Sequence, residues 1–136
     1  MVRPALDSPD PRPLVLIVDD EDMIRTLVRA LLEANGYRVL EAENGQRAAE
    51  LVAGESDGVD LLITDVRMPG LTGPELVRLL RAARPALPII FISGFTGDER
   101  LEPPSLATEY VAKPFALPSM LAAVRRLLKQ GCVAVS

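Results

Sequence analysis

Residues 14–20 read LVLIVDD, an unbroken aliphatic run followed by two aspartates. An apolar run that ends in acid is typical of a strand buried on both faces of a parallel sheet. Two later stretches have the same form: VDLLIT at 59–64, followed by Asp65, and PIIFI at 88–92, followed by Ser93. This repetition predicts a parallel sheet whose strands end at polar side chains.

Helical patterns alternate with these strands. Apolar residues recur at three-to-four spacing from Met23 to Leu32 and stop before Asn35-Gly36, which signals the end of a helix. The remaining predicted elements are strands at 37–42 and 110–112, helices at 46–53 and 74–83, and a last helix around 120–128 that ends near Gly131. Five strands alternating with helices predict an α/β fold, a doubly wound parallel sheet covered by helices on both faces.

The length of 136 residues suits one domain. Residues 1–13 hold four of the twelve prolines and few apolar groups, so we expect a disordered tail or linker there. The predicted domain covers 14–130, and 131–136 form a short tail. Within it, Pro103-Pro104 and nearby glycines interrupt the region between strands four and five, so the fourth helix should be short or irregular.

Composition excludes several classes of function. The net charge of −4 has the wrong sign for a domain that binds nucleic acid. The chain has no histidine and a single cysteine, Cys132, which leaves no plausible zinc site, no internal disulfide and no histidine-based catalysis. No apolar run is long enough to span a membrane and no secretion signal is apparent, so we expect a cytoplasmic protein without membrane contact.

Ligands of open α/β sheets bind beyond the carboxyl ends of the strands, where the winding direction reverses. Polar residues occupy that position after four of the predicted strands, namely Asp19 and Asp20, Asp65, Ser93 and Lys113. Carboxylates gathered there repel one another by about 4 kcal/mol per pair at 4 Å and an effective dielectric of 20. Mg²⁺ offsets such repulsion well because it prefers oxygen ligands, and Lys113 adds a compact charge that pairs with phosphate.

Each of these residues also has a purely structural interpretation. An aspartate after a strand is commonly a turn or helix-capping residue, and Asp19 to Asp22 are placed to interact with the start of the next helix. Ser93 alone suits a turn hydroxyl, Lys113 a solvated charge, and Tyr110 a packed aromatic at the sheet edge. The functional interpretation depends on all of them meeting at one edge of the sheet.

The sequence resembles the receiver domain of the two-component response-regulator family across nearly all of residues 14–130. The resemblance rests on four motifs in order: VDDED at 18–22, ITDVRMPGLTG at 63–73, ISG at 92–94 and YVAKPF at 110–115. Ser93-Gly94-Phe95 is similar to the same segment of receivers associated with hybrid histidine kinases or with general stress signalling. The family implies a flavodoxin-like five-stranded sheet in the order 2-1-3-4-5.

The resemblance also implies roles for the acidic residues. Asp65 would be the phosphoacceptor, receiving the group from a phosphohistidine on a histidine kinase or histidine phosphotransfer protein. Asp20, the Asp65 carboxylate and the backbone carbonyl of Arg67 would bind Mg²⁺, with Asp19 acting through water. Such a domain is a signalling switch of a phosphorelay and catalyses only its own phosphotransfer and autodephosphorylation.

The remaining roles concern the phosphoryl group and the response to it. Ser93 and Lys113 would contact the phosphoryl group, and the Lys113-Pro114 bond would be cis, as is usual in the family. Ser93 and Tyr110 would form the switch between two states. Arg67 and Phe95 occupy positions that tune hydrolysis of the acyl phosphate, and we expect Phe95 to shield it from water.

The sequence bears on three functions other than a phosphorylation switch. A receiver-like scaffold that is never phosphorylated and binds a partner constitutively remains open on these residues. A metal-dependent phosphatase lacks support, since no acid stands two residues beyond Asp65. Nucleotide binding is weaker still, because no glycine-rich phosphate loop follows the first strand.

Overall fold

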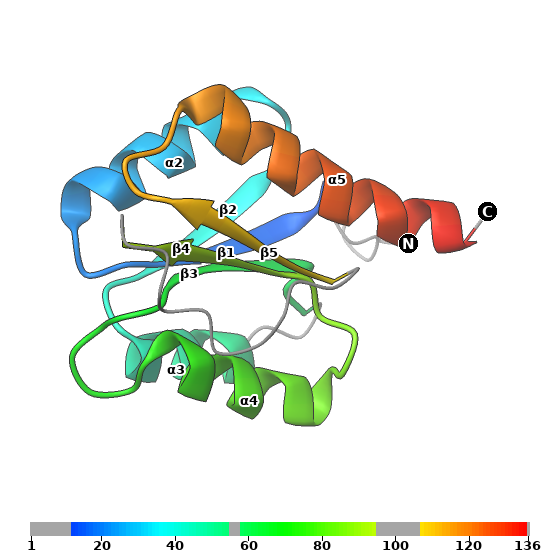
Figure 1. The fold of residues 1–136 in the computed structure, drawn as a ribbon. Helices are drawn as coiled ribbons and strands as arrows, with labels where there is room; N and C mark the ends of the chain where they lie inside the picture. Colours follow the sequence, from blue (N-terminus) through cyan, green and yellow to red (C-terminus); the bar gives the residue numbers. More distant parts are fainter. Residues whose placement is uncertain (1–11, 55–57, 95–106, 136) are drawn as a thin grey trace, which may run out of the picture.

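The computed structural model describes residues 12–54, 58–94 and 107–135. Its strands are β1 (Leu14–Val18), β2 (Arg38–Ala42), β3 (Leu61–Asp65), β4 (Ile89–Ser93) and β5 (Thr108–Ala112). Its helices are α2 (Asp22–Ala34), α3 (Gly45–Gly54), α4 (Gly73–Ala83) and α5 (Leu117–Val135). All strand pairs are parallel and the order is β2-β1-β3-β4-β5, which confirms the predicted doubly wound α/β sheet (Figure 1).

The apolar runs divide their side chains between two cores because neighbours along a strand point to opposite faces. In β1, Leu14, Leu16 and Val18 belong to the core on the α3 and α4 side. Val15 and Ile17 belong to the core on the α2 and α5 side. Figure 1 shows the two helix pairs on opposite faces of the sheet. Since both faces are covered, the sequence signal of these strands is a continuous apolar run.

The start of α4 lies against the end of β3. Thr72 and Glu75 form a reciprocal capping box at the helix N-terminus, with Pro74 in the first turn. The Gly73 amide donates to the carbonyl of Val66 at 3.0 Å. A Cβ at Gly73 would lie 2.2 Å from the carbonyl oxygen of Asp65, so only glycine allows the helix to begin this close to the strand.

Several predicted boundaries need correction. β5 begins at Thr108, two residues before the predicted strand, where its pairing with Ile89 of β4 starts. The last helix does not end near Gly131: α5 continues to Val135, so the glycine is accommodated inside the helix. The predicted irregular fourth helix falls mainly at 95–106, outside the described residues. None of the described helices meets the length and hydropathy needed to cross a membrane.

Replacing Gly73 with alanine tests the close approach of α4 to β3. We expect Gly73→Ala to lower the free energy of unfolding by about 2 kcal/mol, because the new methyl group collides with a backbone carbonyl that cannot rotate away. Chemical denaturation followed by circular dichroism measures the change.

The matched control is Gly54→Ala, since a Cβ at this helical glycine would meet nothing within 4 Å. Its stability should be unchanged or raised by up to about 1 kcal/mol. Equal stabilities of the Gly73→Ala variant and the wild type would contradict the predicted collision.

Candidate functional site

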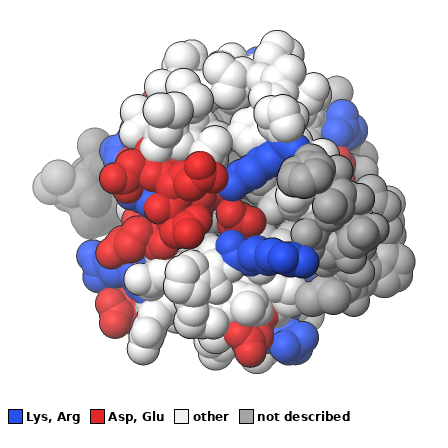
Figure 2. Space-filling view, turned by 60° about the vertical axis from the view of Figure 1, so that its left-hand side comes forward, with Lys and Arg blue, Asp and Glu red and all other residues white. Residues whose placement is uncertain are grey.

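Three carboxylates meet at the carboxyl edge of the sheet. Asp19 and Asp20 follow β1, and Asp65 is the last residue of the neighbouring β3. Each offers one oxygen that lies within 4.8 Å of the other two. Figure 2 shows acidic side chains gathered on this face with basic side chains beside them. The structure therefore brings together the three acids that the sequence predicted would meet.

Asp19 is the most buried of the three acids, with no exposed surface. Its Oδ1 accepts a hydrogen bond from the Glu21 amide at 2.8 Å, which supports the start of α2. Its Oδ2 is buried and accepts no hydrogen bond from the described residues. Burial raises the pKa of Asp19, and the nearby Asp65 carboxylate adds to this, against the opposing effects of the Glu21 amide and Lys113.

The Asp65 carboxylate is held in one orientation by contacts to both of its oxygens. Oδ1 accepts from the amide of Arg67 at 3.2 Å, and Oδ2 accepts from the ammonium of Lys113 at 3.1 Å. The side chain is 12% exposed, so it is nearly buried but accessible from the carboxyl edge of the sheet. The role predicted for the Arg67 carbonyl stays a prediction, since the hydrogen bond described between this residue and Asp65 is made by the amide.

Lys113 is the cation of this cluster and follows β5 directly. Its Nζ lies 2.7 Å from Glu21 Oε1 and 3.4 Å from Asp19 Oδ2, in addition to its bond with Asp65. Burial by itself lowers the pKa of Lys113, but the three carboxylates outweigh burial and raise it above the usual value. The ammonium therefore stays charged. The peptide bond from Lys113 to Pro114 is cis, as predicted.

Glu21 is a site residue that the sequence interpretation missed. The sequence places it only within a helix cap. Glu21 is indeed the N-cap residue of α2, although its side chain makes no capping hydrogen bond. Instead the carboxylate reaches across the sheet edge to Lys113, 92 positions away in the sequence. Its place directly after the two aspartates was a usable signal, but its partner is visible only in the folded chain.

Ser93 is the last residue of β4, and Tyr110 lies on β5, the strand that Lys113 follows. Ser93 is buried at the end of β4, and its carbonyl accepts from the Lys113 amide at 2.8 Å. Tyr110 stacks on Phe91, with ring centroids 5.3 Å apart and an angle of 23° between the rings. In this structure Tyr110 is therefore packed against the aromatic ring of the neighbouring strand. Phe95, predicted to shield the phosphoryl group, lies outside the described residues.

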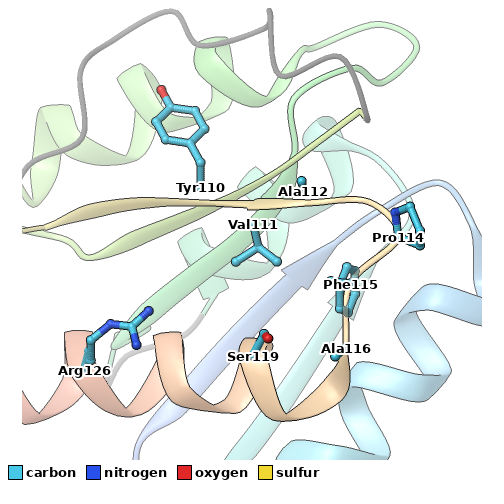
Figure 3. Close-up of a pocket in the computed structure, with 8 residues that line it drawn as sticks. All are labelled: Tyr110, Val111, Ala112, Pro114, Phe115, Ala116, Ser119 and Arg126. Atoms are coloured by element: carbon cyan, nitrogen blue, oxygen red, sulfur yellow. The ribbon is translucent and has the colours of Figure 1, made fainter.

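A separate hollow of about 330 Å³ lies where β5 meets α5. Val111, Phe115 and Ser119 are among its lining residues, and Arg126 lines it while paired with Glu109 at 2.7 Å. Figure 3 shows Tyr110 pointing to the opposite side of β5 from Val111. Its lining includes Tyr110, the predicted switch residue, but none of the acidic side chains gathered at the carboxyl edge of the sheet.

The donor set fits a small, hard divalent cation. Three carboxylates, those of Asp19, Glu21 and Asp65, contact the Lys113 ammonium, and Asp20 adds a further acid beside Asp19 and Asp65. Among the described residues of this cluster, the acids therefore outnumber the ammonium. The buried Asp19 Oδ2 still has the capacity to accept a hydrogen bond or a cation-bound water. Oxygen ligands only, with no nitrogen or sulfur donor among them, favour Mg²⁺ over zinc or copper.

The family model described as the response regulator receiver domain matches residues 15–125. The chain belongs to this family. The match runs from the second residue of β1 through β5 and into roughly the first half of α5, so it contains all of the residues at the carboxyl edge of the sheet. It is a domain of two-component signalling systems, as the motifs predicted, and the receiver fold accounts for the sheet order.

The relatives include response regulators and a sensor kinase. The receiver is 36% identical over 118 residues to the sensor kinase CckA of Brucella abortus, covering 85% of this chain but 12% of the kinase. It is 39% identical to the response regulator MprA of Mycolicibacterium vanbaalenii, covering 85% of this chain and 50% of that protein. The chain therefore spans half or less of the length of these relatives.

Solved structures agree with these relatives. The receiver domain of the hybrid histidine kinase CckA superposes with a TM-score of 0.72 at 32% identity, covering 85% of this chain and 98% of that one. A response regulator receiver protein from Pseudomonas putida has a TM-score of 0.72 at 30% identity, with 87% and 99% covered. The likeness to a hybrid-kinase receiver matches the resemblance seen at Ser93-Gly94-Phe95.

We predict that Asp19→Asn stabilises the metal-free domain at neutral pH. The folded pKa of Asp19 lies above its unfolded value, so the wild type loses stability as the pH rises from the unfolded pKa through the folded pKa, and the neutral amide avoids this loss. The advantage should disappear at a pH below the ordinary aspartate range, where both states of the wild type bind the proton. Thermal unfolding with and without Mg²⁺ measures both variants.

Mg²⁺ should stabilise the wild type and have a smaller effect on Asp19→Asn, since the variant has less charge to offset. Glu50→Gln is the control, because the pair that Glu50 forms with Arg47 is exposed, so this substitution should change stability by about 0.5 kcal/mol or less. A less stable Asp19→Asn variant without Mg²⁺ would show that ionised Asp19 supports the fold.

Proposed function

We propose that the domain is the phosphoacceptor switch of a phosphorelay. In this function Asp65 takes a phosphoryl group from a phosphohistidine on a histidine kinase or a histidine phosphotransfer protein. The observation that carries the proposal is the placement of Asp65: nearly buried, oriented through both oxygens, and in contact with Lys113 beside two further acids. The chain has no histidine, so the phosphodonor is a separate group.

The transfer is a displacement at phosphorus. A carboxylate oxygen of Asp65 attacks the phosphorus, the new O–P bond forms as the N–P bond of the phosphoimidazole breaks, and the electron pair stays with the imidazole nitrogen. Phosphoryl transfer asks a protein mainly for a positioned nucleophile and for neutralisation of charge on the phosphoryl oxygens. The contacts of Asp65 to Arg67 and Lys113 hold the nucleophile, and the ammonium neutralises charge.

Asp20, Asp65 and the carbonyl of Arg67 would hold Mg²⁺, with Asp19 interacting through a bound water. When bound, the cation offsets the negative charge of the acids and of the incoming phosphoryl group. Lys113 leaves its carboxylate partners in part to pair with the phosphoryl oxygens. The Ser93 hydroxyl, buried at the end of the next strand, donates a further hydrogen bond to them.

The response to phosphorylation in this proposal involves Ser93 and Tyr110. Tyr110 starts from a stack on Phe91, in register with it on the neighbouring strand. Movement of Ser93 toward the phosphoryl group would free space near the end of β4 and bias the tyrosine toward a second position. Arg67, two residues after the acceptor, and Phe95 would tune the lifetime of the acyl phosphate. We propose the cytoplasm as the location of the reaction.

Incubation with phosphoramidate and Mg²⁺ tests the proposal directly. We expect intact-mass spectrometry to record the addition of one phosphoryl group to the wild type and none to Asp65→Ala, which has lost the nucleophile. Removal of Mg²⁺ with a chelator should suppress the reaction, because the acids then repel the anionic donor.

Glu50→Gln is again the control, since this exposed residue of α3 is far along the chain from the site and pairs only with Arg47 among the described residues. It should gain the phosphoryl group at the wild-type rate. A wild type that stays unmodified under these conditions would favour the constitutive scaffold, and a modified Asp65→Ala would place the acceptor elsewhere.

A further inference from the structure

Arg25 of α2 lies behind the loop that carries the first two site aspartates. Its Nη1 donates to the carbonyl oxygen of Asp19 at 2.5 Å, and its Nε donates to Glu41 Oε1 of β2 at 3.2 Å. Its Nη2 is bonded to the carboxylate of Asp22. The side chain is only 13% exposed. One guanidinium thus joins the end of β1, the start of α2 and the end of β2.

The hydrogen bond from Arg25 to the Asp19 carbonyl completes the anchoring of Asp19. The Asp19 amide donates to the carbonyl of Ala42 at 3.2 Å, and Oδ1 accepts from the Glu21 amide. Its carbonyl lies just beyond the last residue of β1, and Arg25 supplies a donor to it. A buried carbonyl that loses its donor is costly, so the peptide has a strong reason to keep this orientation. Oδ2 alone is left to face the site.

We propose that Arg25 is a positioning residue for the metal-binding acids. By holding the peptide that joins Asp19 to Asp20, it keeps their carboxylates close enough to Asp65 for one cation to contact the group. The inference rests on the proposed function, because it assigns Arg25 a role in preparing that same site for Mg²⁺ and phosphoryl transfer. It adds a residue that touches neither the phosphoryl group nor the metal.

Positioning and charge make opposite predictions at Arg25. A cation beside an acidic cluster repels Mg²⁺, so loss of the Arg25 charge alone would tighten metal binding. Asp22 and Glu41 already neutralise much of that charge through their direct bonds. If the main role of Arg25 is to orient the loop, its removal weakens metal binding although a repulsive charge has gone. The sign of the effect therefore separates the two roles.

Arg29 provides a matched control one helical turn later. It also bonds to Glu41, at 2.7 Å, and to Glu33 at 3.0 Å, but within the described part of the chain it makes no bond to the loop that carries Asp19 and Asp20. Both arginines therefore join α2 to β2 through the same carboxylate, and only Arg25 reaches Asp19. Neutralising Arg29 removes a comparable charge and a comparable helix-to-strand contact without releasing the Asp19 carbonyl.

The experiment compares the wild type with Arg25→Gln, Arg29→Gln and Arg25→Lys. Isothermal titration calorimetry with MgCl₂ measures the affinity, and thermal unfolding without Mg²⁺ confirms that each variant is folded. We expect Arg25→Gln to bind Mg²⁺ about tenfold more weakly, the usual size of an effect on residues that orient metal ligands. Arg29→Gln should bind as tightly as the wild type or slightly more tightly.

Arg25→Lys keeps the charge and one donor group but loses the planar fork that reaches three acceptors. Its Mg²⁺ affinity should lie between those of the wild type and Arg25→Gln, and this milder variant keeps the test valid if Arg25→Gln unfolds. Phosphorylation by phosphoramidate should slow about tenfold in Arg25→Gln at limiting Mg²⁺. At saturating Mg²⁺ the difference should shrink, because excess metal compensates for the weaker site.

Equal Mg²⁺ affinities for Arg25→Gln and Arg29→Gln, or tighter binding by Arg25→Gln, would overturn the role of Arg25 while leaving phosphorylation of Asp65 in place. A wild type that binds Mg²⁺ but is never phosphorylated would overturn the proposed function and not the positioning role. A wild type that binds no Mg²⁺ would overturn both.

Discussion

Repulsion between carboxylates is the constraint on which the rest of this structure depends. Asp19, Asp20 and Asp65 are brought within reach of one cation, and Glu21 adds a fourth negative charge beside them. Two such charges 4 Å apart repel by about 4 kcal/mol at an effective dielectric of 20. Lys113 offsets part of this through three carboxylate contacts. In the proposed function, the remaining negative charge attracts Mg²⁺, and the cation in turn attracts the phosphoryl group.

The fold tolerates this cluster because its strongest elements lie directly underneath. β1, β3 and β4 are buried along their whole length and packed between two helical layers. Their side chains anchor the backbone, so the acids that follow cannot move apart without disturbing a core. Gly73 adds a second restraint by letting α4 begin against the carbonyl of Asp65. Charge crowding at the edge is thus supported by apolar burial in the middle.

The contacts around the acids are of two kinds: some reach a carboxylate, and others reach the backbone that carries it. Lys113 and the Arg67 amide touch the carboxylate of Asp65 and set its orientation. Arg25 acts from behind the loop, on the carbonyl of Asp19, and is itself held by Asp22 and Glu41. A buried carboxylate without a full set of partners is unfavourable for stability, as the raised pKa of Asp19 indicates. The site therefore combines a destabilising charge cluster with a well-anchored backbone.

The sequence by itself determined the strand runs, the alternation with helices and the residues at the strand ends, because burial on both faces and helical periodicity are local patterns. It also placed Asp19, Asp20, Asp65, Ser93 and Lys113 at the carboxyl edge of the sheet, since each lies at the end of a strand or just beyond it. It misjudged where β5 begins and where α5 ends, because pairing with β4 and the continuation of a helix through Gly131 have no clear local signal.

Only the tertiary structure decided which partners these side chains take. Lys113 bonds to Glu21, 92 positions away in the sequence. Arg25 donates to the backbone carbonyl of Asp19 in addition to pairing with Asp22 on its own helix. Contacts of this kind depend on how far long side chains extend over a finished sheet edge. Periodicity places a residue on an element, but the distance between two elements exists only after the chain has packed, and that distance selects the partner.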